Sequence, residues 1–379
     1  VRLGTRKVYW RESMANMDME KVRNVGIVGH GGVGKTMLIE HILHLAGVTG
    51  RVGTIEAGNT VCDYLEEETA RKHSITMKLT NLEWNGTRVH IVDHPGYVDF
   101  VGEIAASAPM LDGYVIVIDA STGPQVGSDN AWKFAEDFTI PRAFFVNKLD
   151  REHTHFDEVV KMLRDTYGSQ CVPIVAPIGE GASLNGVVNI INGDTSAIGN
   201  VAEEFKEEIV EAVAETDDAL LEKYLEAGEL SEDDFNKGLQ AGIQSGKIVP
   251  IIAGSVAKDL GLREMLDIIA NSFPSPAHRK VIAKNNKDED VEVKVGPDEP
   301  FFAQVFRSMV DPFVGHLTFF RVLSGTLRSD SEFVNVTTGS KERTGKIFLL
   351  NGKEQKQANE VGPGDLAALT KLKNTHFGD

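Results

Sequence analysis

The sequence predicts an α/β fold with a mostly parallel sheet and helices on both faces, followed by a small antiparallel β-barrel. Two observations support this prediction. The apolar segment 24–28 has the character of a buried strand and leads through a glycine-rich turn into residues 35–46, where apolar residues follow a helical spacing that stops at Gly47. After residue 300, short apolar segments separated by turn residues indicate antiparallel strands.

The glycine-rich turn fits the pattern G-x-x-x-x-G-K-[ST], and its flanking strand and helix are those that a phosphate-binding loop requires. It consists of Gly29, His30, Gly31, Gly32, Val33, Gly34, Lys35 and Thr36. Backbone N–H groups in such a turn, together with the positive end of the helix dipole, face a bound anion. We expect Lys35 to reach the outer phosphates of a nucleotide and the Thr36 hydroxyl to bind Mg²⁺.

A second element of the site follows the segment 88–92, which is expected to pair with the strand 79–84 through an Asn85-Gly86 turn. This strand delivers Asp93-His94-Pro95-Gly96 at its carboxyl end. A carboxylate at Asp93 can hold the water shell of Mg²⁺, and the backbone N–H of Gly96 can contact a γ-phosphate.

A third element selects the base. Asn147-Lys148-Leu149-Asp150 follows the apolar segment 143–146. An ionised Asp150 can accept two hydrogen bonds from the N1–H and N2–H₂ edge of guanine, and the Lys148 stem can lie along the base. Adenine has no donor at that edge, so Asp150 argues against a P-loop ATPase or kinase, the remaining alternative.

These segments resemble known GTP-binding elements in the order in which those elements occur. Asp93 to Gly96 and Asn147 to Asp150 are similar to the D-x-x-G and N-K-x-D signatures, and Gly254-Ser255, after the strand 248–253, resembles the last guanine-contacting loop. Residues 93–100 are similar to the D-T-P-G-H-V-D-F segment of translational GTPases, and residues 147–151 to their N-K-M-D-R.

Residues 311–325 resemble the second domain of elongation factor G, and the likeness runs from about residue 20 to the end of the sequence. The chain is therefore similar to an elongation factor G-like translational GTPase, a divergent paralogue of elongation factor G. The resemblance implies GTP and GDP with Mg²⁺ as ligands, and hydrolysis coupled to a step of elongation or translocation. It also implies binding to ribosomal RNA and proteins at the factor-binding site of the ribosome.

Several positions depart from the family pattern. Tyr97 stands where the family has a histidine that positions the attacking water. A tyrosine side chain is neutral near pH 7, whereas an imidazole can also carry a positive charge. With Lys35 and Gly96, Tyr97 makes up the candidate catalytic set, and we expect slow hydrolysis without the ribosome. The alternative is a GTP-switched ribosome-binding module with little or no hydrolysis. His94 replaces a family threonine and is expected to be a solvated loop residue.

The first mobile loop is also altered, because residues 73–76 read H-S-I-T where the family has R-G-I-T. The resemblance makes Thr76 a candidate second Mg²⁺ ligand beside Thr36, with Asp93 acting through water. Thr76 would then order the loop only when a γ-phosphate is present. The alternative is a structural threonine that begins the following strand.

The predicted domain boundaries follow from composition. Residues 1–20 form a poorly ordered leader, 21–276 the GTP-binding domain with an insert at about 158–245, 277–299 a charged linker, and 300–379 a β-barrel that lacks its last strand. Within the insert, 203–226 is expected to be one acidic amphipathic helix. The barrel strands are expected at 301–306, 317–323, 332–336, 344–350 and 366–372.

The net charge of −17 argues against DNA or general nucleic-acid binding. The near-neutral barrel, however, carries a basic group that can touch ribosomal RNA phosphate: Lys341, Arg343, Lys346, Lys353 and Lys356. The sequence shows neither an apolar run long enough for a membrane span nor a signal-peptide pattern, and the two cysteines are far apart. We expect a monomeric, cytoplasmic protein without membrane contact.

Overall fold

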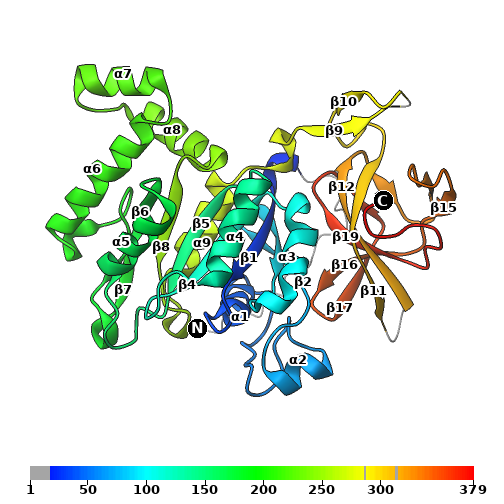
Figure 1. The fold of residues 1–379 in the computed structure, drawn as a ribbon, viewed down its shortest axis with the longest axis horizontal. Coiled ribbons are helices and arrows are strands. Elements are labelled where there is room, and N and C mark those ends of the chain that lie inside the picture. Colours follow the sequence, from blue (N-terminus) through cyan, green and yellow to red (C-terminus); the bar gives the residue numbers. More distant parts are fainter. Residues whose placement is uncertain (1–17, 286, 312–314) are drawn as a thin grey trace, which may run out of the picture.

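A computed structural model describes residues 18–285, 287–311 and 315–379 of the chain (Figure 1). The predicted leader and the 311–315 part of the elongation factor G likeness lie largely outside these residues. The chain forms a central sheet wrapped by helices, here called the α/β domain, and a set of strands from β11 to β19, here called the β domain. In Figure 1, helices α6 to α8 lie at the end of the α/β domain that is remote from the β domain.

The eight-stranded sheet has the order β2-β3-β1-β4-β5-β8-β6-β7. The strands from β3 to β6 in that order run parallel, and the edge strands β2 and β7 are antiparallel to their neighbours. The predicted mostly parallel sheet is therefore confirmed. Its strands are β1 (Val22–Gly29), β2 (Lys78–Trp84), β3 (Thr87–Asp93), β4 (Gly113–Asp119), β5 (Arg142–Asn147), β6 (Cys171–Ile178), β7 (Gly186–Asn189) and β8 (Val249–Ala253).

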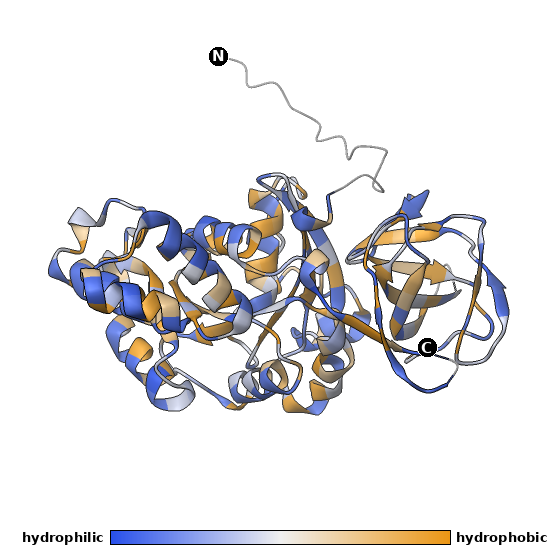
Figure 2. Cartoon of the chain, turned by 90° about the horizontal axis from the view of Figure 1, so that it is seen from above, coloured by the Kyte–Doolittle hydropathy of each residue, from blue (hydrophilic) through white to orange (hydrophobic). Residues whose placement is uncertain are grey.

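Every residue of the central strands β1, β3, β4, β5 and β8 is buried, as expected where helices cover both faces of a parallel sheet. Figure 2 shows hydrophobic residues concentrated on the strands. Helix α1 contacts α9, and α3 packs against α4, which lies in front of the sheet in Figure 1. The helices are α1 (Lys35–Leu45), α2 (Glu66–Arg71), α3 (Val101–Ser107), α4 (Val126–Asp137), α5 (Phe156–Tyr167) and α9 (Leu262–Ser272).

The part of the chain between β5 and β8 contributes strands to the central sheet as well as acidic helices. Its strands β6 and β7 extend the sheet beyond β8. The single helix predicted for 203–226 is wrong, because the chain forms α6 (Asn200–Ala214), α7 (Asp218–Ala227) and α8 (Glu232–Ser245). The break has a local cause, since the Asp217 carboxylate accepts a hydrogen bond from the Ala219 N–H and caps a new helix.

The β domain contains a five-stranded antiparallel sheet of order β11-β12-β19-β16-β17, which confirms the predicted antiparallel domain. Shorter strands pair beside it, and several of them had no clear alternating pattern in the sequence. The strands are β11 (Phe302–Asp311), β12 (Gly315–Ser324), β13 (Leu327–Arg328), β14 (Glu332–Val334), β15 (Lys341–Arg343), β16 (Ile347–Asn351), β17 (Glu354–Ala358), β18 (Glu360–Val361) and β19 (Leu366–Thr370).

The segment expected to be a linker contains a hairpin of β9 (Val281–Lys284) and β10 (Asp290–Val293). The alternating apolar residues of β10 and the cross-strand ion pair of Lys284 with Asp290, at 3.1 Å, favour this pairing.

Strand β12 contributes buried apolar residues on both of its faces. Leu317 and Phe319 of β12 pack into the core of the α/β domain, whereas Phe320 and Val322 pack inside the β domain. This alternation is the period of two that a strand imposes on its side chains. The two domains therefore share a continuous apolar interface.

Buried charges cross the same interface. Arg321, which is 1% exposed, donates to the Met110 carbonyl at 2.7 Å and pairs with the Asp112 carboxylate at 2.7 Å. Asn24 donates to Asp112 at 2.8 Å and to the Gly364 carbonyl at 2.9 Å. Buried ion pairs need such extra hydrogen bonds to offset desolvation, and this interface supplies them.

A second buried ion pair joins β3 to the loop before β19. Arg88 donates to Asp365 at 2.9 Å, and the same carboxylate oxygen lies 3.4 Å from Nε2 of His90. Burial lowers the pKa of His90 below its ordinary value of 6.5, and the Asp365 contact opposes this shift only in part. His90 is therefore neutral in the folded protein near pH 7.

None of the helices within the described ranges is long and apolar enough to cross a bilayer.

The His90 environment predicts acid-sensitive stability. An unfolded chain protonates His90 below about pH 6.5, whereas the folded chain resists protonation, so the stability from a neutral His90 is lost as the pH falls below 6.5. The loss has an upper limit of about 1.4 kcal/mol per pH unit. His90→Gln should reduce the fall in unfolding free energy between pH 7.5 and 5.5, measured by urea denaturation. The exposed His44, changed to Gln, serves as the control and should keep the wild-type slope. Identical slopes for all three proteins would contradict the prediction.

Candidate nucleotide-binding site

The predicted site residues lie at the carboxyl ends of neighbouring strands of the sheet. Loops follow β3, β1, β5 and β8, which are close together in the strand order. Ligands of open parallel sheets bind at this edge because the strand ends and helix starts meet there. The fold therefore brings the phosphate loop, the Asp93 loop, the Asn147 loop and the Gly254-Ser255 loop to one place.

The phosphate loop spans from β1 to the first turn of α1. Gly34 caps α1 with a φ of 104°, a conformation that side-chain-bearing residues rarely adopt. Lys35 is 7% exposed, and its Nζ donates to the Gly29 carbonyl at 3.0 Å and the His30 carbonyl at 2.8 Å. Burial lowers the pKa of Lys35, and the nearby Asp93 carboxylate opposes this shift. The ammonium group thus lies inside the loop, where an anion would meet it.

The Asp93 loop packs directly on the phosphate loop. A Cβ at Gly96 would lie 2.3 Å from Nζ of Lys35 and 2.6 Å from the His30 carbonyl oxygen, so only glycine fits there. The Thr36 hydroxyl donates to Oδ2 of Asp93 at 3.3 Å, whereas Oδ1 of Asp93 has no hydrogen-bond partner among the described residues. Burial raises the pKa of Asp93, the charge of Asp63 raises it further, and Lys35 opposes both.

These groups fit a divalent cation. Mg²⁺ prefers carboxylate, hydroxyl and water oxygens, and Asp93 presents a free oxygen beside the Thr36 hydroxyl. Thr76 is not part of this group in the structure, because its hydroxyl accepts from Nζ of Lys78 at 2.6 Å and bonds Glu68 at 3.4 Å. Ser74 occupies the place instead, with Oγ 3.2 Å from the Thr36 hydroxyl. A ligand role for Thr76 stays a prediction that requires this loop to rearrange.

His94 is not the solvated loop residue that we expected. Its side chain is 0% exposed, and Nε2 lies 2.6 Å from the Ser107 hydroxyl of α3. Burial lowers its pKa to about 3, so the ring is neutral. The side chain packs against Ser107 and the Tyr114 ring, which leaves the backbone of His94 and Pro95 as the part able to line a nucleotide site.

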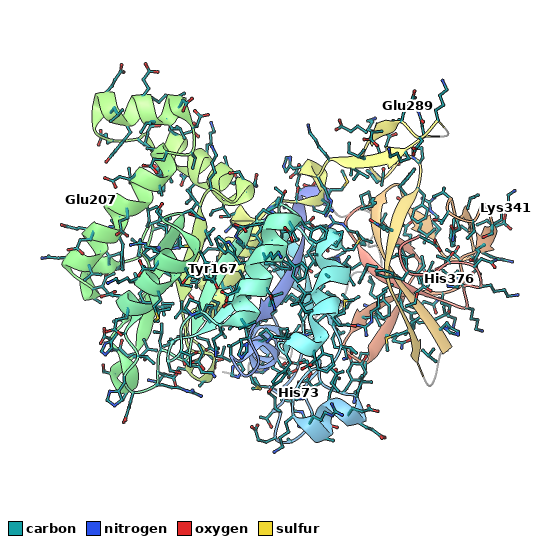
Figure 3. All side chains as sticks on the ribbon, in the orientation of Figure 1. His73, Tyr167, Glu207, Glu289, Lys341 and His376 are labelled. Carbon is teal, nitrogen blue, oxygen red and sulfur yellow. The ribbon has the colours of Figure 1, made fainter. Side chains whose placement is uncertain are left out.

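Tyr97 lies on the phosphate loop with a partly exposed ring. A Cβ at Gly31 would lie 3.1 Å from Cζ of Tyr97, so the ring covers the middle of the loop. The His73 ring packs against it at 4.6 Å between centroids, and Figure 3 places His73 near α2. The ring at position 97 thus contacts two of the loops that surround the candidate phosphate site.

Asn147 connects three of the loops. Its Nδ2 donates to the Val33 carbonyl of the phosphate loop at 2.9 Å, and its Oδ1 accepts from the N–H of Lys148 at 2.8 Å and of Val256 at 2.9 Å. Asp150 accepts a hydrogen bond from the Ser255 hydroxyl at 2.5 Å. Ser255 is fully buried and so fixes the direction of the Asp150 carboxylate.

Three further side chains at the site were missed by the sequence analysis. Asp119, at the end of β4, accepts a hydrogen bond from Nζ of Lys148 at 2.6 Å. The same Nζ donates to the Gly32 carbonyl, so the Lys148 side chain lies over the phosphate loop. A carboxylate at a strand end was a usable signal for Asp119. Ser74 lies in the segment 73–76 that resembles the family's R-G-I-T, from which only Thr76 was singled out, and Asp63 lies on a segment without a strand or motif signal.

Comparisons with known proteins identify the families that this chain matches. The family model described as "Elongation factor Tu GTP binding domain" matches residues 20–275, and the model described as "Elongation factor G domain 2" matches residues 300–379. The chain is also similar to a crystal structure of a protein from Thermus thermophilus, with a TM-score of 0.84 and 29% sequence identity. The match covers 95% of this chain and 54% of that chain, so this chain spans about half the length of the protein that it matches.

The loop geometry predicts unequal effects for two glycines. An alanine Cβ at Gly32, with a φ of 79°, would meet nothing within 4 Å, whereas at Gly34 it would lie 2.5 Å from Nδ2 of Asn147. Gly32→Ala should therefore cost about 1 kcal/mol of unfolding free energy from backbone strain alone. Gly34→Ala should cost at least about 2 kcal/mol more, because Asn147 must move and give up buried hydrogen bonds. Urea denaturation without nucleotide measures the unfolding free energy of both variants. Equal losses of unfolding free energy would show that the contact with Asn147 does not contribute to stability.

Proposed function

Because the chain belongs to the translational GTPases related to elongation factors Tu and G, we propose that it binds GTP with Mg²⁺, hydrolyses it to GDP and phosphate, and acts on the ribosome in elongation or translocation. This chain spans about half of the similar solved protein, so the proposal concerns the natural polypeptide that contains it.

The observation that carries the proposal is the convergence of the loops on Asn147. That amide joins the phosphate loop to the base loop and to the Ser255 loop through hydrogen bonds of 2.8 to 2.9 Å. The Asp150 carboxylate is oriented by Ser255 and offers acceptor oxygens only. Guanine presents two donors to such a group, whereas adenine would leave the carboxylate desolvated and unpaired.

Each remaining residue has a proposed role at the phosphates. Lys35 exchanges its bonds to the Gly29 and His30 carbonyls for the outer phosphates, and the N–H of Gly96 approaches the γ-phosphate. Thr36 and Asp93 would hold the metal, Asp93 through water, and Thr76 would join them once the γ-phosphate orders its loop. Mg²⁺ bound there neutralises the charge of the phosphates.

Tyr97 determines which of two functions applies. Its ring lies against Gly31, and its hydroxyl can accept or donate a hydrogen bond to an attacking water. In the proposed enzyme it positions this water, at low efficiency until the ribosome orders the loop. The second candidate is a GTP-switched ribosome-binding module, in which the tyrosine ring covers the phosphate loop and hydrolysis is incidental. The partly exposed ring at the family's histidine position favours this second candidate.

The proposed partner is the factor-binding site of the ribosome. The basic group of the β domain is exposed, and Figure 3 shows Lys341 at the outer edge of that domain. Exposed lysines and arginines can neutralise ribosomal RNA phosphates. The proposal includes a monomeric protein in the cytoplasm, without DNA or membrane as a partner.

GTP hydrolysis by the natural polypeptide, with and without purified ribosomes at matched Mg²⁺, tests the function. We expect strong stimulation by ribosomes. Tyr97→Phe keeps the ring on Gly31 and removes the hydroxyl, so it should lower the stimulated rate by on the order of tenfold or more if Tyr97 positions the water.

Tyr97→His separates the two candidates. A large rise in hydrolysis with this variant, where the wild type shows GTP-dependent ribosome binding without stimulation, would establish the switch module. Neither candidate survives if the wild type does not bind ribosomes at all.

A further inference from the structure

Two departures from the family pattern lie against each other in the structure. His73 stands where the family has an arginine, and Tyr97 stands where it has a histidine. The centroids of the two rings are 4.6 Å apart, and the Phe100 ring lies 6.3 Å from the same imidazole. The imidazole that is absent from position 97 is therefore present beside it, on a different loop.

His73 is held in place by the chain around it. Lys72 ends α2 in a left-handed conformation with a φ of 58°, which changes the direction of the chain just before His73. The Glu68 carboxylate of α2 is 0% exposed and accepts hydrogen bonds from the backbone N–H groups of Ile75, at 3.1 Å, and Thr76, at 3.2 Å. The short segment that carries His73 is thus fixed to α2 on both sides.

The hydrogen bond of the His73 ring defines its tautomer. Nδ1 lies 3.2 Å from the Ser74 carbonyl oxygen, which can only accept, so Nδ1 carries the hydrogen. In the neutral imidazole Nε2 is then the acceptor. An arginine at this position would offer donors alone. His73 therefore brings to Tyr97 an acceptor that the family's arginine lacks.

The hydroxyl end of the Tyr97 ring is the part that reaches the phosphate loop. A Cβ at Gly31 would lie 3.1 Å from Cζ, the atom that bears the hydroxyl. A Cβ at the adjacent Gly96 would lie 2.7 Å from the Gly31 nitrogen and 2.3 Å from Nζ of Lys35. The Tyr97 hydroxyl and the Lys35 ammonium therefore border the same part of the loop, where the γ-phosphate is proposed to bind.

A tyrosine hydroxyl at this place needs an acceptor of its own. Its single hydrogen lets it either donate to a water or accept from one. A water that attacks the γ-phosphorus uses a lone pair for the new P–O bond, so the group that positions it must accept a hydrogen bond from it. When Nε2 of His73 takes the Tyr97 hydrogen, the hydroxyl oxygen is left to accept from the water.

We propose that His73 is a positioning residue for GTP hydrolysis, whose Nε2 accepts a hydrogen bond from the Tyr97 hydroxyl in the GTP complex. The proposal rests on the enzyme of the proposed function and adds a residue to it. The reaction is unchanged: the water oxygen bonds to the γ-phosphorus, the bond to the bridging oxygen breaks with its electron pair going to GDP, and the released phosphate takes up the water's proton. His73 acts through Tyr97 alone.

The test compares single-turnover GTP hydrolysis by the natural polypeptide at saturating ribosomes with its affinity for fluorescent GDP (mant-GDP). His73→Phe keeps a ring against Tyr97 and removes the acceptor. It should lower the hydrolysis rate by about tenfold to a hundredfold and leave the mant-GDP affinity unchanged, because only the alignment of the water is lost. His73→Gln, whose side-chain oxygen again offers an acceptor, should restore most of the rate.

Two further variants act as controls. Nδ1 of the exposed His44 lies 3.1 Å from the Thr49 carbonyl oxygen, the same kind of bond as that of His73, so His44→Phe is the matched change and should keep the wild-type rate. The double variant His73→Phe with Tyr97→Phe should be no slower than Tyr97→Phe alone, because without the hydroxyl His73 has nothing to orient.

The outcomes separate this inference from the proposed function. If ribosomes do not stimulate the wild type, the proposed enzyme fails and the role of His73 fails with it. If they do, a wild-type rate for His73→Phe would overturn the role of His73 while the function stands. Equal losses for His73→Phe and His73→Gln would show that ring packing matters rather than the acceptor, and would also overturn it. The same holds if the double variant is slower than Tyr97→Phe by the full His73→Phe factor.

Discussion

The side-chain amide of Asn147 is the contact on which the nucleotide site depends. It lies at the end of β5, is 3% exposed, and connects the phosphate loop, the base loop and the loop after β8 through one donated and two accepted hydrogen bonds. A buried amide with such bonds is rigid, because breaking any one of them leaves a polar group without water or partner. Asp150 lies three residues later in the same loop, and the hydrogen bond from the Ser255 hydroxyl orients its carboxylate. In the proposed function, specificity for the base therefore depends on the same hydrogen-bond network that holds the phosphate loop.

The interface between the domains extends this rigidity to the β domain. One face of β12 packs into the α/β core, and Arg321 on that face reaches Asp112 and the Met110 carbonyl. The second ion pair, between Arg88 and Asp365, begins on β3, the strand that ends at Asp93. Strand β3 thus carries Asp93, a candidate metal-site residue, at one end and the interface residue Arg88 near the other.

Local patterns predicted which loops meet at the edge of the sheet, and long-range packing explains why Asp63 and the burial of His94 were missed. The loops ending in Thr36, Gly96 and Asp150 follow apolar strands and carry residue types that the chemistry demands, so sequence alone located them. Asp63 could not be found this way, since its loop has no periodicity and its burial depends on α1 and Ser74 being brought together by the fold. The prediction of a solvated His94 was wrong for the same reason, because the side chain is buried against Ser107 of α3. The break between α6 and α7 was locally readable, since an aspartate before an apolar run is a helix cap.

The central claim is that these loops form one site that selects guanine nucleotides. Calorimetric titration of the wild-type polypeptide with GDP and with ATP, in the presence of Mg²⁺, tests it most directly. The account predicts that GDP binds at a single site and that ATP binds weaker by roughly 10³-fold or more, because a site built to accept hydrogen bonds from guanine leaves its carboxylate unpaired with adenine. Equal affinities for GDP and ATP, or no binding of either nucleotide, would contradict it.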